Sequence, residues 1–279
     1  MKNILKIMLM MITIFTIAGS AVYAAEIPVS DQDQLITSSD WTEISNLQDE
    51  MKKEEPDATI DYDKALKVYV DCNLIKLQTA DTKKLTSALE SANYVWVIPF
   101  KMEKTYGMFT VAKGLPLREE AKSVLTKAEQ EEVKNHAGKW MITEIAEHTV
   151  EPYYDILLEK REALSDCTRV VLVGSQPGMR QPVALGMDDE TARIWISLGY
   201  QYPVMEKIPE TQNVESGVYS FDSVAEISDT YIEDSEVSTG AGVQSRSSMK
   251  YVAGIGIVLI GGILILSVLK KKKIRIKFF

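Results

Sequence analysis

The chain has 279 residues, of which 46% are hydrophobic and 25% are charged, a composition that excludes wholesale disorder and allows one or two domains. Its two cysteines exclude a disulfide-dense scaffold and a four-cysteine zinc site, and its two histidines leave little for a histidine-based metal centre. The formal net charge is −9, with 40 acidic against 23 basic residues between positions 26 and 250, and this acidic excess predicts no nucleic acid binding because it repels phosphates.

Residues 1–24 have the pattern of a secretory signal peptide. Two lysines precede an apolar stretch from Ile7 to Ala18, and small side chains follow it. We therefore expect cleavage between Ala24 and Ala25. The alternative is an uncleaved N-terminal anchor, for which this apolar stretch is short.

Residues 25–62 predict an N-terminal helical extension. Its helix spans residues 40–54, because Asp40 is placed to cap it and apolar residues follow with helical spacing. Those apolar residues are Trp41, Ile44, Leu47 and Met51.

Residues 63–205 predict an α+β extracytoplasmic domain, either as one unit or as two subdomains that divide near residues 146–151. The predicted strands span 65–72, 94–100, 106–112, 139–145, 168–174, 182–187 and 191–199. The predicted helices span 82–92, capped by Asp81, then 116–137, with a capping box of Thr126 and Glu129 inside it, and 152–164. The first six elements follow the order β-α-β-β-α-β, which is that of a split βαβ, ferredoxin-like section in a mixed or antiparallel sheet.

The two cysteines flank predicted core strands, Cys72 at the end of one and Cys167 just before another. In an oxidising compartment this pair predicts a disulfide that closes a loop of about 95 residues. Two buried, reduced thiols are the alternative. A catalytic cysteine would need a histidine base nearby, and the sequence does not place His136 or His148 beside either thiol.

Three further groups were weighed as sites, and each has a better structural explanation. Glu144 and His148 would share a helix face for a metal, but they fall on a predicted strand. Gly174-Ser175-Gln176-Pro177-Gly178 follows a strand but lacks the nucleophile-elbow pattern, and it is better explained as a turn between strands. Asp188, Asp189 and Glu190 could hold Ca²⁺, although a solvated hairpin tip is the simpler interpretation. No nucleotide-binding motif occurs, so we expect no cofactor and no metal.

Residues 206–249 predict an acidic, Ser- and Gly-rich stalk, to which Val218–Phe221 could add an edge strand. Within the stalk, Val237-Ser238-Thr239-Gly240 precedes an apolar stretch and a basic tail. This order resembles the cell-wall sorting signal of Gram-positive surface proteins, whose motif is LPxTG. Glu236 and Val237 stand where that motif has Leu and Pro. The resemblance implies cleavage after Thr239 by a sortase and attachment to the cell wall.

Residues 250–269 predict a transmembrane helix, because the stretch from Tyr251 to Leu269 is uncharged and just long enough to cross a bilayer. The basic tail, residues 270–279, begins with Lys270, Lys271, Lys272 and Lys273, and these lysines place the tail in the cytoplasm. With a cleaved signal peptide this gives a single-pass type I protein of the cell membrane with its body outside. A buried helix of a soluble fold is the alternative.

These features together predict a membrane-anchored binding or interaction protein of a bacterial cell envelope, without catalytic activity. Its partner would be another envelope protein or an extracellular ligand, and the acidic body favours a cationic one. An extracytoplasmic hydrolase with an unassigned active site is one alternative. A sortase-processed surface protein is the other.

Overall fold

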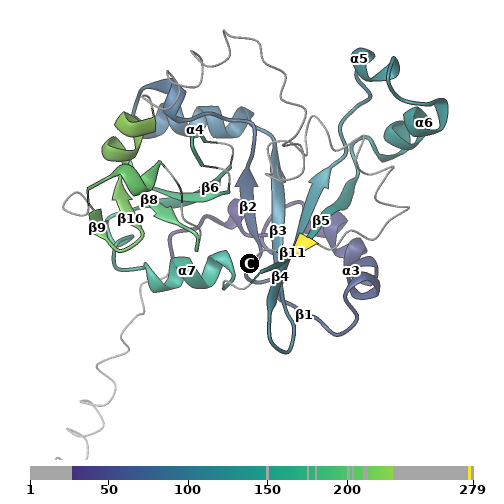
Figure 1. Ribbon diagram of the computed structural model, residues 1–279, viewed down its shortest axis with the longest axis horizontal. Coiled ribbons are helices and arrows are strands. Elements are labelled where there is room, and N and C mark those ends of the chain that lie inside the picture. The colour runs from purple at the N-terminus through teal and green to yellow at the C-terminus, as the bar shows by residue number, and fades with distance from the viewer. Residues whose placement is uncertain are drawn as a thin grey trace, which may run out of the picture.

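A single twisted sheet organises the molecule (Figure 1). The computed structural model describes residues 27–148, 151–174, 176–179, 181–199, 202, 204–209, 213–228 and 276–277. The sheet has eleven strands in the order β11-β5-β4-β3-β2-β6-β7-β8-β10-β9, and β1 pairs with β3 outside this path. The strands are β1 (Thr59–Ile60), β2 (Leu66–Tyr69), β3 (Tyr94–Lys101), β4 (Tyr106–Lys113), β5 (Trp140–His148), β6 (Arg169–Val173), β7 (Val183–Met187), β8 (Ala192–Ser197), β9 (Asn213–Glu215), β10 (Val218–Ser220) and β11 (Ile276–Lys277).

Two antiparallel meanders form the two halves of the sheet. One contains β2, β3, β4 and β5, and the other contains β6, β7, β8, β10 and β9. β2 and β6 join the halves as a parallel pair, with Val68 opposite Leu172. The described body therefore folds around one sheet.

The α+β prediction is confirmed, but its ferredoxin-like pairing is wrong. In a split βαβ unit, another strand lies between the two strands that the first helix connects. Here β2 and β3 pair directly and antiparallel, with Leu66 opposite Val97. The other side of β2 is taken by β6. Sequence periodicity identifies the elements, whereas this competition between distant strands for the edges of β2 decides the pairing.

Helices and short 3₁₀ turns cover both faces of the sheet. The α-helices are α2 (Trp41–Ile44), α3 (Gln48–Glu54), α4 (Thr82–Ser91), α5 (Glu119–Lys122), α6 (Lys127–His136) and α7 (Tyr153–Glu159), and residues 221–228 are also helical. The 3₁₀ turns are η1 (Asp31–Asp33), η2 (Ser45–Leu47), η3 (Ile75–Leu77) and η4 (Met205–Lys207).

Strand alternation divides the core between the two faces. Along β6, Val170 and Leu172 pack with Leu157 of α7 on one face. Val171 on the same strand packs with Leu85 of α4 on the other face. Figure 1 shows α4 and α7 on opposite sides of this half of the sheet.

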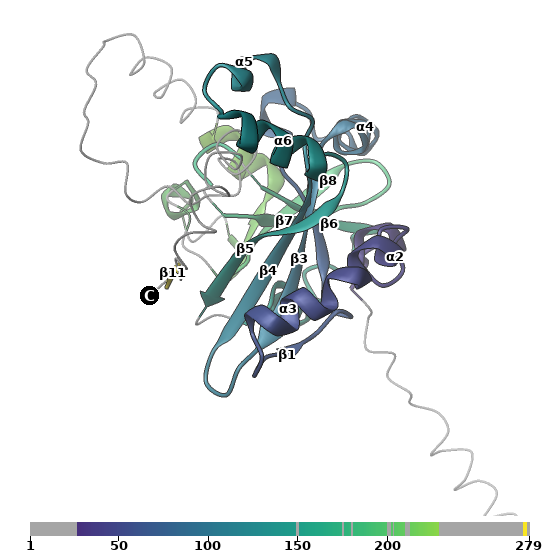
Figure 2. The same ribbon diagram turned by 90° about the vertical axis from the view of Figure 1, so that its right-hand side faces the viewer.

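The same alternation continues along β3 in the other half of the sheet. Val97 joins the α7 side, whereas Trp96, Ile98 and Phe100 pack with the segment that contains α2 and α3. Figure 2 shows α2 and α3 lying against this half. β3 is therefore buried on both of its faces.

The body is larger than residues 63–205. On the N-terminal side, Leu35, Ile44 and Met51 are fully buried against the sheet, so this segment is part of the core. On the C-terminal side, Phe221 and Val224 are buried in the cluster beneath α4. Within the segment predicted as a stalk, Val218–Ser220 pair with β8, as the sequence allowed, and these apolar side chains complete the core.

The predicted membrane segment, residues 250–269, lies outside the described residues. Within the residues that are described, no helix combines the length and hydrophobicity needed to cross a bilayer. Near the C-terminus, β11 pairs in parallel with β5, with Ile276 opposite Ala146. A span at residues 250–269 would put these two strands on opposite sides of a membrane, so the span and this pairing exclude each other within one chain.

Candidate functional site

Between β4 and β5 the chain leaves the sheet and forms a projecting helical segment, which we call the arm (residues 115–139). Figures 1 and 2 show its helices α5 and α6 standing beyond the ends of β4 and β5. The predicted capping box begins α6: the Thr126 hydroxyl accepts from the backbone N–H of Glu129, and the Glu129 carboxylate accepts from the Thr126 N–H at 2.8 Å. Lys134 and Glu131 form an i,i+3 ion pair on its surface. Local interactions of this kind stabilise a helix without tertiary packing.

The arm makes little apolar contact with the body. No residue of α6 is buried. Between α5 and α6, Leu125 is buried while its neighbour Val124 is 66% exposed. The amide of Gln130 donates to the carbonyl oxygens of Leu125 and Lys122, which ties α6 to the turn before it. The arm is thus held together by its own polar contacts and presents its side chains to solvent.

Backbone pairing fixes the root of the arm to the sheet. The Gly114 N–H donates to the Lys139 carbonyl at 2.9 Å, and the Gly138 N–H donates to the Gly114 carbonyl at 2.8 Å. A Cβ at Gly114 would lie 2.1 Å from the carbonyl oxygen of His136, so only glycine allows this approach. Gly138 has φ +74°, the left-handed conformation expected at the end of a helix.

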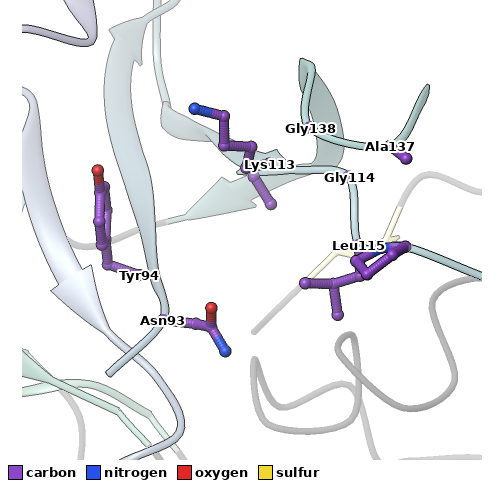
Figure 3. A pocket seen from close by; sticks show the side chains of 9 residues that line it. Asn93, Tyr94, Lys113, Gly114, Leu115, Ala137 and Gly138 are labelled. Atoms are coloured by element: carbon purple, nitrogen blue, oxygen red, sulfur yellow. The ribbon is translucent and has the colours of Figure 1, made fainter. Parts of the chain in front are cut away.

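A pocket of about 220 Å³ lies at this root (Figure 3). Its lining comprises Asn93, Tyr94, Ala112, Lys113, Gly114, Leu115, Pro116, Ala137 and Gly138. Among these lining residues Lys113 alone is charged, and its ammonium lies 5.4 Å from the ring centroid of Trp140. One cation among apolar and backbone groups can hold a small anionic or aromatic group, but it supplies no acid–base pair for catalysis.

The strand that follows the arm, β5, is the long edge of the sheet. It pairs with β4 along its length, with a β-bulge opposite Thr110 and Val111. Its residue Glu144 lies opposite Thr110. Burial raises the pKa of the Glu144 carboxyl, and a hydrogen bond with Thr110 opposes that rise. On its outer side, among the described residues, β5 pairs only with the two residues of β11.

A buried charge cluster that the sequence did not reveal lies on the face that carries α2, α3 and α4. Asp33 is 1% exposed, and it accepts from the Tyr69 hydroxyl at 2.8 Å and the Arg169 guanidinium at 2.9 Å. The Lys67 ammonium lies 3.7 Å from Oδ1 of Asp33, the oxygen that also accepts from Tyr69. Desolvation lowers the pKa of Lys67 although Asp33 opposes this, and burial raises the pKa of Tyr69.

Aromatic rings continue this cluster across β3. The Lys67 ammonium lies 4.5 Å from the ring centroid of Tyr94 and 5.2 Å from that of Trp96. Asp40 accepts from the Tyr94 hydroxyl at 2.9 Å and the Trp96 indole N–H at 3.0 Å. Asp40 therefore does not cap α2, which has no side-chain cap. Together Asp33 and Asp40 fasten the N-terminal segment to the sheet, which is a structural role.

The structure does not join the two cysteines, and both are free thiols. Cys167 belongs to the cluster on the α7 face, whereas Cys72 packs against the cluster on the α4 face. The sheet therefore lies between them. Burial raises the pKa of each thiol to about 11.

The other groups weighed from the sequence have structural explanations. Glu144 and His148 both lie on β5, where residues four apart are about 13 Å apart along the strand and do not share a helix turn. Asp188 accepts from the backbone N–H groups of Glu190 and Thr191 and pairs with Arg193, which lowers the pKa of its carboxyl.

Gln176, in the loop after β6, is buried and bonded to backbone atoms of Cys72, Leu74 and Gly174, while Ser175 lies outside the described residues. No group of three or more metal-ligating side chains occurs in the described part of the chain.

The remaining sites predicted from the sequence are not covered by the structure. The expected signal cleavage site at Ala24 and Ala25, the sorting-like residues around Thr239, and the basic anchor all lie outside the described residues. The anchor comprises Lys270, Lys271, Lys272 and Lys273.

Comparison with known proteins gives no match: no family model, no curated protein and no solved structure is significantly similar to this chain. The arm, the pocket at its root and the edge strand β5 therefore form the candidate site on their geometry alone.

Proposed function

We propose that the protein is a membrane-anchored, extracytoplasmic binding protein that holds another polypeptide of the cell envelope and catalyses no reaction. The signal peptide, the span and the lysine-rich tail support the anchored topology. The arm is the element that contacts the partner. The arm itself is charge-balanced, with five acidic and five basic residues, so it is the acidic excess of the rest of the body that favours a partner with net positive charge.

The observation that carries this proposal is the exposure of α6. It has ten residues, yet none of them is buried, and it is kept folded by its capping box and surface ion pairs. A helix that contributes nothing to the core and stands at the end of a projecting segment is available to a partner. The pocket beside it, with Lys113 at its rim, gives that partner a second point of contact.

The thiols do not support a hydrolase that uses a cysteine nucleophile. A thiol nucleophile works as the thiolate, which requires a pKa lowered towards neutrality. Here burial raises the pKa of Cys72 and Cys167 to about 11, so both stay protonated at neutral pH.

Affinity capture with the full-length chain tests the proposal. The chain is expressed in the cells that make it, crosslinked in intact membranes and purified at controlled salt. Val124→Arg adds a charge to the exposed arm and should remove the captured partner. Val214→Arg is the matched control, because Val214 is an exposed valine of β9 at the opposite end of the sheet, and it should leave capture unchanged.

Equal capture by both variants would contradict the role of the arm. Specific turnover of a substrate that disappears with Cys167→Ala would contradict the non-catalytic function. Protease digestion of intact cells that removes the tail but spares the body would contradict the topology.

A further inference from the structure

The two ends of the sheet differ in what they offer to another strand. The end at β9 is three residues long, whereas β5 is nine residues long. An edge strand carries unpaired backbone N–H and C=O groups that can pair with another extended chain. Among the described residues, only Ile276 and Lys277 of β11 use the outer side of β5.

The residues of β11 indicate which chemistry fits this edge. They pair in parallel, with Ile276 opposite Ala146 and Lys277 opposite Glu147. An apolar residue thus stands against an apolar one, and a lysine against a glutamate. The sequence around β11, Ile274-Arg275-Ile276-Lys277, alternates apolar and basic residues with the period of a strand. Opposite charges in register on paired strands favour association.

We infer that the outer edge of β5 is a strand-accepting site for an extended segment of the partner, in which apolar residues alternate with lysine or arginine. The inference rests on the proposed function, which it deepens by naming the surface and the partner's chemistry. In the anchored topology the chain's own tail lies across the membrane, so another polypeptide supplies the strand. Backbone pairing provides the affinity, and Glu147 of β5 favours a basic residue opposite it.

A synthetic peptide of residues 272–279, Lys-Lys-Ile-Arg-Ile-Lys-Phe-Phe, serves as the probe. The full-length chain is placed in lipid nanodiscs, so that its own tail lies on the face opposite the body. Binding is measured by fluorescence anisotropy, and amide hydrogen exchange locates it. The peptide should slow exchange in residues 140–148 and leave residues 213–215 of β9 unchanged, because only the first strand offers the long edge.

Peptide and protein variants separate strand pairing from simple charge attraction. A peptide with Ile276→Pro keeps every charge but loses a backbone N–H, and it should bind at least about tenfold more weakly. Glu147→Lys in the protein should weaken the native peptide roughly fivefold, and the peptide with Lys277→Glu should recover the loss. Glu90→Lys, at an exposed position of α4, is the matched charge control and should have little effect.

Equal binding of the proline peptide, or protection that falls outside residues 140–148, would overturn the inference. So would protease and exchange data showing that the chain's own tail occupies β5 in the nanodisc, and that result would also overturn the anchored topology. Loss of partner capture with Val124→Arg, together with unchanged peptide binding at β5, would uphold the arm and the edge as separate contacts. If the peptide does not bind at β5 but partner capture still depends on Val124, the proposed function stands and this inference is overturned.

Discussion

Two helices of equal length connect neighbouring antiparallel strands, and they are used in opposite ways. α4 links β2 to β3 and α6 links β4 to β5, and each has ten residues and a side-chain N-cap. α4 buries Leu85 and Leu89 in the core, whereas the residues of α6 are exposed or only partly buried. The core of the body therefore depends on α4, whereas the surface of α6 is available for binding.

The largest expected difference in stability is between removing a buried charge from the body and removing an exposed charge from the arm. Asp33→Ala leaves Lys67 and Arg169 beside each other without their carboxylate, and it should lower the free energy of unfolding by about 3–5 kcal/mol. Glu131→Ala removes an exposed ion pair of α6 and should change it by less than about 0.5 kcal/mol. Urea unfolding of the purified chain followed by tryptophan fluorescence measures both, and similar losses would contradict the distinction.

The next largest difference is expected when an apolar side chain is truncated in each of the two helices. Leu85→Ala opens a cavity under α4 and should cost about 2–5 kcal/mol in unfolding free energy. Val133→Ala, in α6, should cost well under about 1 kcal/mol, because no residue of that helix is buried. The same urea titration compares them. A large loss for Val133→Ala would show that α6 packs against something the body needs.

The caps test how far each helix is coupled to the whole fold. Asp81 accepts from the backbone N–H groups of Lys83 and Lys84, so Asp81→Ala should lower global stability by about 1 kcal/mol. Thr126→Ala should instead speed amide exchange within residues 127–136 without moving the global transition. Hydrogen exchange and thermal unfolding measured together distinguish local from global loss. A shared global shift would mean that arm and body unfold as one unit.

The smallest effect concerns the edge strand and depends on pH. Burial raises the pKa of Glu144, so its ionised form weakens the folded state. This cost is present above the folded-state pKa and is lost as the pH falls below the unfolded-state pKa. Glu144→Gln should therefore stabilise the chain at neutral pH, and the gain should shrink as the pH falls towards 4. A gain that grows on acidification would contradict the assigned direction.

Local signals in the sequence predicted much of the fold. The cap at Asp81, the capping box of Thr126 and Glu129, and the hairpin of β3 and β4 each depend on residues close in the chain, and the structure contains all of them. The low apolar content of α6, where only Ala128 and Val133 interrupt polar residues, could also have indicated its exposure.

Contacts between residues far apart in the chain could not be predicted from the sequence. Asp33 and Arg169 are 136 residues apart, and nothing near either residue indicates their pairing. Asp40 has the position of a cap but bonds to Tyr94 and Trp96 instead, because tertiary partners outcompete the local one. The parallel pairing of β2 with β6 depends in the same way on which strands compete for an edge.

Removing the arm tests the central claim most directly. Lys113 and Trp140 are paired in register, so an Asn-Gly turn in place of residues 114–139 joins β4 to β5 as a tight hairpin. Unfolding free energy and partner capture are then measured on this variant. We expect the unfolding free energy to stay within about 1 kcal/mol of that of the full chain and the partner to be lost. An unfolded variant, or one that still captures the partner, would contradict that claim.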